Sequence, residues 1–203
     1  MPIIRRPRPH TRNFAARRFV DSAQTIGEQA IILQMYHAAN VNDAAQTKCT
    51  VCWDSVYQQN SKSNCTECYG STYENGVKFT YRSWSIWTEA QDNEKYTKRG
   101  EYQPESRDVQ LEAYPEVFQH DFLIRVTRWA DDGRTPLELY PWRYVFTSGI
   151  TDAIVHTGGQ LSQGDQDRWG QRASVSALTR DHTIYSYPIS LVNPYPRKSG
   201  PPS

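Results

Sequence analysis

Alternating apolar and polar residues predict that much of this chain is β-strand. In residues 28–43, EQAIILQMYHAANVND, every odd position from Ile31 to Met35 is apolar, which suits a strand covered on most of one face. Residues 76–90, GVKFTYRSWSIWTEA, alternate until Ser83 shifts the phase, as a bulge would. Both segments therefore indicate strands.

The strongest strand signal lies between residues 120 and 149. Two runs of alternating residues flank Asp132-Gly133, a turn pair that predicts a β-hairpin. Residues 149–159, GITDAIVHTGG, are expected to continue as a further strand.

The remaining segments have weaker patterns. Residues 93–116 are polar and predict a long loop or flexible excursion. Residues 161–189 predict a polar loop, a short apolar stretch around Val175 to Leu178, and a last extended piece. The Pro-rich residues 193–203, NPYPRKSGPPS, are expected to run along a surface.

The first 18 residues form a basic arm that contains no acidic residue. From Arg12 to about Thr25 the pattern predicts a short helix, which Ile26-Gly27 ends. Two interpretations stay open: a solvated tail with a surface helix, or an arm that becomes ordered on a neighbouring subunit or on phosphate backbone. The candidate contact residues are Arg5, Arg6, Arg8, Arg12, Arg17 and Arg18.

Sequential strands with one short helix predict a mostly β fold, either a small antiparallel β-barrel or a sandwich. A parallel α/β fold is not expected, because the long helical crossovers that it needs are missing. We divide the chain into a basic arm (1–18), a main β domain (19–47 and 77–190), a four-cysteine insertion (48–76) and a Pro-rich tail (191–203).

All four cysteines lie in residues 48–70, KCTVCWDSVYQQNSKSNCTECYG, as two Cys-x-x-Cys pairs with twelve residues between them. Each pair points two thiolates the same way, and two such turns together give tetrahedral S4 zinc ligation with bonds of about 2.3 Å. The spacer is too polar to form a core, so we expect the metal to stabilise this zinc-knuckle or ribbon module. The predicted ligands of a structural zinc ion are Cys49, Cys52, Cys65 and Cys68.

Besides structural zinc, four cysteines can serve as a redox pair, an iron-sulfur site or a catalytic zinc site, and the compartment bears on the choice. The sequence shows no signal-peptide pattern and no window near the roughly 20 apolar residues of a membrane span, so we expect synthesis in a reducing cytosol and no membrane contact. A thiol redox pair needs an exposed cysteine of low pKa in a βαβ context, which the pattern lacks. An iron-sulfur cluster can use the same thiolates, whereas a catalytic zinc needs the open position that four cysteines close.

Charge and composition favour contacts over catalysis. The net charge is only +1, so no global field favours wrapping of nucleic acid or a membrane surface. Thirteen tyrosines and six tryptophans supply amphipathic side chains, which in strand patterns are expected to pack in cores or subunit interfaces. None of the five histidines, Ser148 or the TGGQ stretch at 157–160 forms a catalytic or phosphate-binding pattern, so we expect no enzyme.

The order of these segments resembles that of small virion proteins at the head-to-tail joint of tailed bacteriophages, in particular the stopper or head-closure type. The resemblance rests on the Arg-rich RRFVDSAQTIGE (17–28), the four-cysteine block with a strand after it, and the closing DHTIYSYPI (181–189). At 203 residues with a metal insertion the chain exceeds the smallest stoppers. Adaptor, tail-terminator and baseplate roles therefore stay open.

The resemblance implies a β-barrel subunit that assembles as a homo-oligomeric ring of six or twelve copies in the virion neck, after synthesis in the host cytoplasm. Its partners would be portal or adaptor and tail proteins, and genomic DNA would pass through the channel without sequence reading. Zinc ligation carries over to the four cysteines, and no catalytic residue carries over. The contrasting hypotheses are a zinc-ribbon nucleic-acid-binding protein, with the module and the arginine arm on phosphates, and a thiol oxidoreductase.

Overall fold

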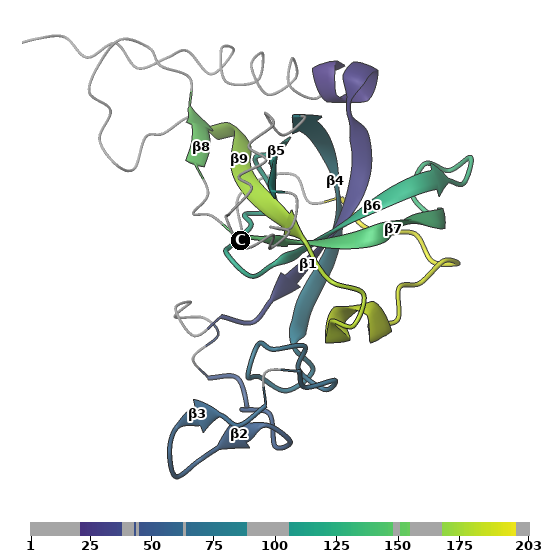
Figure 1. Ribbon diagram of the computed structural model, residues 1–203. Coiled ribbons are helices and arrows are strands. Elements are labelled where there is room, and N and C mark those ends of the chain that lie inside the picture. Colours follow the sequence, from purple (N-terminus) through teal and green to yellow (C-terminus); the bar gives the residue numbers. More distant parts are fainter. Residues whose placement is uncertain are drawn as a thin grey trace, which may run out of the picture.

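The computed structural model describes residues 21–37, 43, 45–62, 64–88, 106–147, 151–154 and 168–197, and these residues are mostly β-strand (Figure 1). The elements in chain order are β1 (Glu28–Met35), β2 (Trp53–Asp54), β3 (Gln59–Asn60), β4 (Val77–Thr88), β5 (Ser106–Glu112), β6 (Phe122–Trp129), β7 (Pro136–Phe146), β8 (Thr151–Ile154), β9 (Arg168–Ala177) and the 3-10 helix η2 (Thr183–Ser186).

A short helical segment, residues 21–26, precedes β1 and ends at Gly27 as predicted. A Cβ at Gly27 would lie 2.6 Å from the carbonyl oxygens of both Ala23 and Ser85, so only glycine lets the helix end lie against β4. Residues 1–20, and with them all six arginines of the arm, lie outside the described residues. No helix in the described ranges has the length and apolarity that crossing a membrane requires.

The main sheet is antiparallel, and its strand pairings form a closed circuit. The strand order is β5-β4-β1-β6-β7-β9-β8, and β9 pairs with β5 as well as with β7 and β8. From β5 the pairings therefore lead through β4, β1, β6, β7 and β9 back to β5. The mostly β prediction is confirmed, and the strand pairs of the main sheet within the described residues are antiparallel, unlike those of an α/β fold.

The strands carry a buried cluster on each face. The first cluster draws on five strands of the circuit and consists of Ala30, Ile32, Val109, Leu111, Val117, Leu123, Tyr144, Phe146, Ala173 and Val175. The second lies on the opposite face of β1 and β6 and consists of Ile31, Leu33, Met35, Phe122, Ile124, Val126, Ile184 and Tyr195. Strand β1 is therefore buried on both faces, not mainly on one as its sequence suggested.

The segment after β9 covers the second cluster and corrects one prediction. Residues expected to be extended include the 3-10 helix η2, in which the amide of Ile184 donates to the side chain of His182 at 3.1 Å. The Pro-rich tail is exposed over residues 191–197, as expected of a segment along a surface, apart from Tyr195, which is buried. The carbonyl of Pro196 also accepts a hydrogen bond of 2.8 Å from the amide of Arg82 on β4.

Strand β5 corrects the prediction of a loop over residues 93–116. Its two aliphatic residues, Val109 and Leu111, are fully buried, and the strand pairs with both β4 and β9. Charged and polar residues surround these two positions, so the local pattern was too weak to show a strand. The predicted hairpin is confirmed as β6 and β7, with Gly133 at φ +59° in the turn, and β8 is a strand as expected.

One buried amide holds the chain after β5. The Nε2 of Gln171 donates to the carbonyls of Glu112 and Pro115 at 2.8 Å and of Ala113 at 3.0 Å. Its Oε1 accepts from the amide of Val117 at 3.0 Å. We expect Gln171→Met to lower the free energy of unfolding by about 3 kcal/mol, because it leaves buried backbone groups without partners.

Urea unfolding monitored by tryptophan fluorescence measures this loss. The matched control is Gln110→Met on the neighbouring strand β5, at a half-buried position. Equal stability of the two variants would contradict the role assigned to Gln171.

Candidate metal centre

The cysteines lie in residues 48–76, between β1 and β4, which we call the lobe. In Figure 1 this lobe extends beyond the end of β1 and contains the small ribbon of β2 and β3. The ribbon pairs Trp53 with Asn60 and Asp54 with Gln59, and an isolated bridge joins positions 48 and 73 at the base of the lobe. The lobe is therefore a separate structural unit joined to the sheet through both of its ends.

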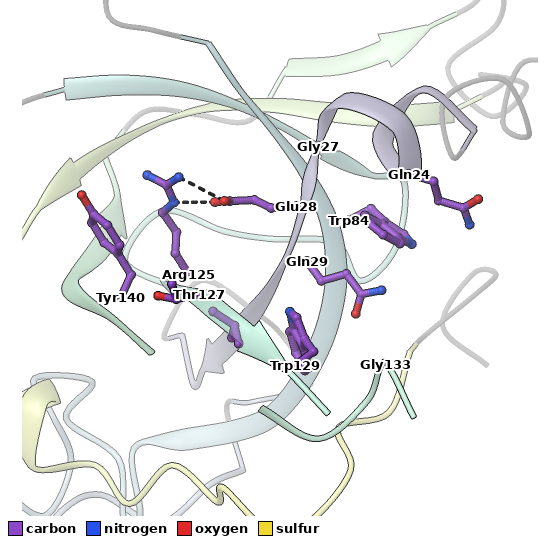
Figure 2. Close-up of a pocket in the computed structure, with 11 residues that line it drawn as sticks. Gln24, Gly27, Glu28, Gln29, Trp84, Arg125, Thr127, Trp129, Gly133 and Tyr140 are labelled. Atoms are coloured by element: carbon purple, nitrogen blue, oxygen red, sulfur yellow. Dashed lines mark hydrogen bonds and ion pairs between the residues drawn. The ribbon is translucent and has the colours of Figure 1, made fainter. Parts of the chain in front are cut away.

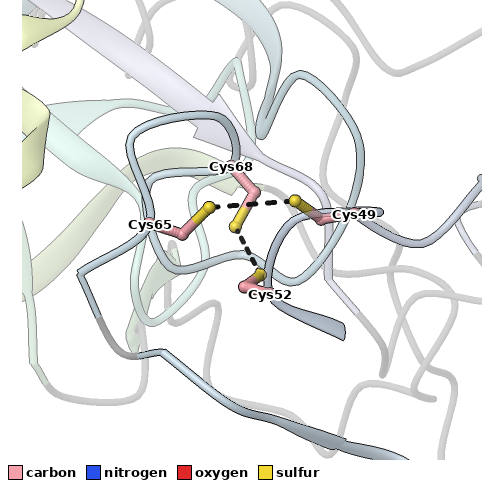
Figure 3. Close-up of side chains that lie close together, drawn as sticks. All are labelled: Cys49, Cys52, Cys65 and Cys68. Carbon is pink, nitrogen blue, oxygen red and sulfur yellow. Dashed lines mark hydrogen bonds between the residues drawn. The ribbon is translucent and has the colours of Figure 1, made fainter. Parts of the chain in front are cut away.

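The four thiols converge on one point (Figure 3). All four Sγ atoms lie within 4.8 Å of one another, with 3.8 Å between Cys49 and Cys65 and 3.4 Å between Cys52 and Cys68. These distances exclude disulfides, whose sulfurs lie about 2.05 Å apart. A tetrahedral S4 site with bonds of about 2.3 Å would place its sulfurs roughly 3.8 Å apart. The four cysteines are thus brought together as predicted, in an arrangement compatible with a bound metal.

Each Cys-x-x-Cys pair makes the same kind of turn. The carbonyl of Cys49 accepts from the amide of Trp53 at 3.0 Å, and the carbonyl of Cys65 accepts from the amide of Tyr69 at 2.9 Å. A Cβ at Gly76 would lie 2.4 Å from the carbonyl oxygen of Cys68, so the chain that returns to β4 passes closely behind the second turn. Local hydrogen bonds and close backbone packing therefore set the direction of the thiols.

Three of the thiols have pKa values shifted in different directions. Burial raises the pKa of Cys52 strongly, helped by hydrogen bonds from the other cysteines, and it is the main cause that raises the pKa of Cys68. Burial alone would also raise the pKa of Cys65, but the backbone amides of Cys68 and Glu67 outweigh it and lower that pKa. A cation that replaces the protons removes the cost of burying thiolates, so this donor set suits a thiolate-binding metal.

The closed shell suits a structural role. Every cysteine is at most 2% exposed, and the four thiols supply all the ligands of a tetrahedral ion. No position is left for a substrate or water. The buried sulfurs also lack the exposure that a reactive redox thiol needs.

The aromatic residues of the lobe differ in what they contact. The ammonium of Lys48 lies 3.6 Å from the ring centroid of Tyr73 and 4.7 Å from that of Trp53. Tyr69 packs edge-on against Tyr187, with ring centroids 5.4 Å apart, and so joins the lobe to the β domain. Tyr57 is 73% exposed. Tyr57 therefore remains the large aromatic side chain of the lobe that faces solvent.

A buried carboxylate at the junction of lobe and sheet was missed by the sequence reasoning. The Oδ1 of Asp121 accepts from the amide of Met35 at 2.8 Å and lies 2.9 Å from Nε2 of His37, and its Oδ2 accepts from the amide of Phe118 at 2.8 Å. A second buried carboxylate, Asp43, accepts from the amide of His37 at 3.1 Å. The His120-Asp121 pair in the sequence gave no hint of this, because the partner is His37.

A comparison of the sequence with protein-family models and with curated proteins found no match. The geometry of the described residues therefore carries the functional argument.

Proposed function

We propose that the four-cysteine centre holds one structural zinc ion. The support is the convergence of four buried thiols at tetrahedral spacing, together with the polar character of the lobe. Iron-sulfur ligation uses the same donors, and metal analysis of protein made in reducing conditions distinguishes the two, because an iron-sulfur protein also absorbs visible light.

We propose further that the closed circuit of pairings is a six-stranded antiparallel β-barrel, and that the chain is a ring-forming structural subunit at the head-to-tail joint of a tailed bacteriophage. The observation that carries this proposal is the clamped lobe. Its metal shell is closed to chemistry, yet it extends away from the sheet and exposes apolar side chains to solvent, which suits assembly.

Electrostatics of the lobe disfavour the nucleic-acid alternative. Residues 48–76 contain two lysines, Lys48 and Lys62, against three acidic residues, Asp54, Glu67 and Glu74. Lys48 is also engaged by aromatic rings. A module that gripped phosphates would need an excess of positive charge, so the lobe fits a protein partner better.

We expect the chain to remain in purified tailed particles after washing with nuclease and high salt. Gold-labelled antibody should mark the junction of head and tail, and particles made without the chain should accumulate as separate heads and tails. Mass spectrometry of the washed particles measures retention. Recovery of the chain only in the soluble fraction, with DNA binding that salt abolishes, would favour the nucleic-acid alternative.

A further inference from the structure

The turn between β2 and β3 presents two apolar side chains to solvent. Val56 is 81% exposed and Tyr57 is 73% exposed. The turn is fixed from within, because Oδ1 of Asp54 accepts from the amide of Val56 at 2.8 Å and from the amide of Tyr57 at 3.1 Å. We call these two side chains the knob. An ordered turn on a metal-clamped lobe loses little conformational entropy when it binds.

A pocket of about 480 Å³ lies between the helical segment, β1, β4, β6 and β7 (Figure 2). Its walls include three aromatic side chains, Trp84, Trp129 and Tyr140. This size lies within the usual range of binding pockets and accommodates a phenol ring with a valine beside it.

The charged groups of the pocket already satisfy one another. Arg125 forms a two-pronged ion pair with Glu28, in which Nη2 lies 3.0 Å from Oε2, and its guanidinium lies 4.7 Å from the ring centroid of Tyr140. Gln29 accepts from Arg82 at 3.2 Å. The pocket therefore offers aromatic faces without an unpaired charge, which disfavours ionic ligands and saccharides that need free polar groups.

The knob matches this chemistry. Neither side chain of the knob carries a charge, and its one polar group is the phenol hydroxyl of Tyr57. The valine and the phenol ring can pack against the aromatic walls of the pocket.

The knob and the pocket of one copy lie at opposite ends of β1. Glu28 and Gln29, at the start of β1, line the pocket, whereas the lobe follows the end of the strand at Met35. An eight-residue strand spans roughly 24 Å. The knob therefore cannot fill the pocket of its own chain.

We propose that the knob of one copy inserts into the pocket of the next copy and anchors a head-to-tail contact. This inference rests on the ring assembly of the proposed function and names the contact that builds the ring. Two different surfaces of the chain meet, so the contact repeats from copy to copy, and it gives a ring when the rotation between copies closes. Two side chains bury less than the roughly 1,200 Å² of a stable interface, so the knob is the hot spot of a larger contact.

Complementation between two full-length, metal-loaded variants tests this contact. Tyr57→Ala removes the phenol ring of the knob and leaves the pocket, and Thr127→Trp fills the pocket from an exposed lining position and leaves the knob. Each variant alone is expected to lose assembly, with the apparent dissociation constant raised at least about tenfold. Mixed together they should form dimers only, because one working knob meets one working pocket. Val192→Ala, at an 82% exposed position after η2, is the control and should assemble like the unmodified chain.

Sedimentation velocity measures the species formed. Larger assemblies for the unmodified chain and dimers for the mixture support the contact. A mixture that stays monomeric beside an assembling parent, or a Tyr57→Ala variant that assembles normally, overturns it, and neither result bears on retention in virions. A parent that stops at a dimer shows reciprocal exchange and overturns the head-to-tail arrangement, and a monomeric parent overturns the contact itself.

A benzoylphenylalanine at position 57 should also crosslink to peptides that contain Trp84 or Trp129 of another copy, and crosslinks elsewhere would place the knob on a different surface.

Discussion

Removal of the metal is expected to unfold residues 48–76 while the β domain stays folded. The lobe has almost no core besides its sulfurs: the cluster of its buried residues consists of Cys49, Cys52, Cys65 and Cys68. Metal binding in such small modules contributes about 10–16 kcal/mol of apparent free energy, which is the free energy of folding itself. The buried members of both sheet clusters lie outside the lobe, so we expect them to stay packed, although Tyr69 of the lobe contacts the second cluster.

Cys52→Ser removes one metal ligand and so tests, without a chelator, whether the metal holds the lobe folded. We expect the variant to lose its metal and to become sensitive to protease between residues 49 and 68, whereas β-strand signals in circular dichroism persist. Val51→Ala is the matched control, because Val51 lies in the same turn but is half exposed and carries no ligand atom. Metal analysis of the parent should give one zinc per chain. Metal-free protein after reducing purification, or unchanged protease resistance of the variant, would refute the clamp.

Acid is expected to release the metal. Burial raises the pKa of the Cys52 and Cys68 thiols, so both are protonated at neutral pH when no cation is bound. Metal binding must therefore displace protons, and its affinity falls as the pH falls.

Features set by local sequence were predictable, and features set by distant pairing were not. The hairpin of β6 and β7 follows from alternation around Asp132-Gly133, and the thiol cluster follows from two short Cys-x-x-Cys turns. Strand β5 escaped prediction because two partner strands, not its own pattern, hold it in the sheet. Tyr195 is buried for a similar reason, since the face that it covers is formed far away in the sequence.

The same distinction holds for the candidate site. The thiol cluster is local, but the end of β1 near the lobe is held by the Asp121–His37 pair, whose members are 84 residues apart. Neither residue lies in a pattern that marks it. The pocket also escaped prediction, because it needs four strands to form. The turn geometry that Asp54 fixes through backbone amides could not be predicted either.

Asp121→Asn is expected to lower the free energy of unfolding of the β domain by about 3 kcal/mol, because the buried carboxylate serves three donors. Asparagine keeps one acceptor oxygen and turns an amino group towards at least one of these donors, so a buried N–H loses its partner. Burial raises the pKa of Asp121, and the hydrogen bonds from His37 and Met35 oppose this rise. Burying the carboxylate is thus unfavourable by itself, and the hydrogen bonds from its donors compensate for this. Loss of these hydrogen bonds therefore lowers the free energy of unfolding.

Urea unfolding measures the expected loss, and hydrogen exchange locates it at the amides of Met35 and Phe118. Asp132→Asn is the matched control, because Asp132 also accepts from two backbone amides but lies exposed in the β6–β7 turn, so its replacement should change stability far less. The amide of Tyr36, between Met35 and His37, donates to the carbonyl of Gly76 at the end of the lobe at 3.1 Å. Asp121→Asn should therefore also increase exchange at the base of the lobe while the zinc content stays at one per chain. Loss of stability without faster exchange at Met35 would show that the carboxylate acts elsewhere, and equal stability of the two variants would show that it does not hold the junction.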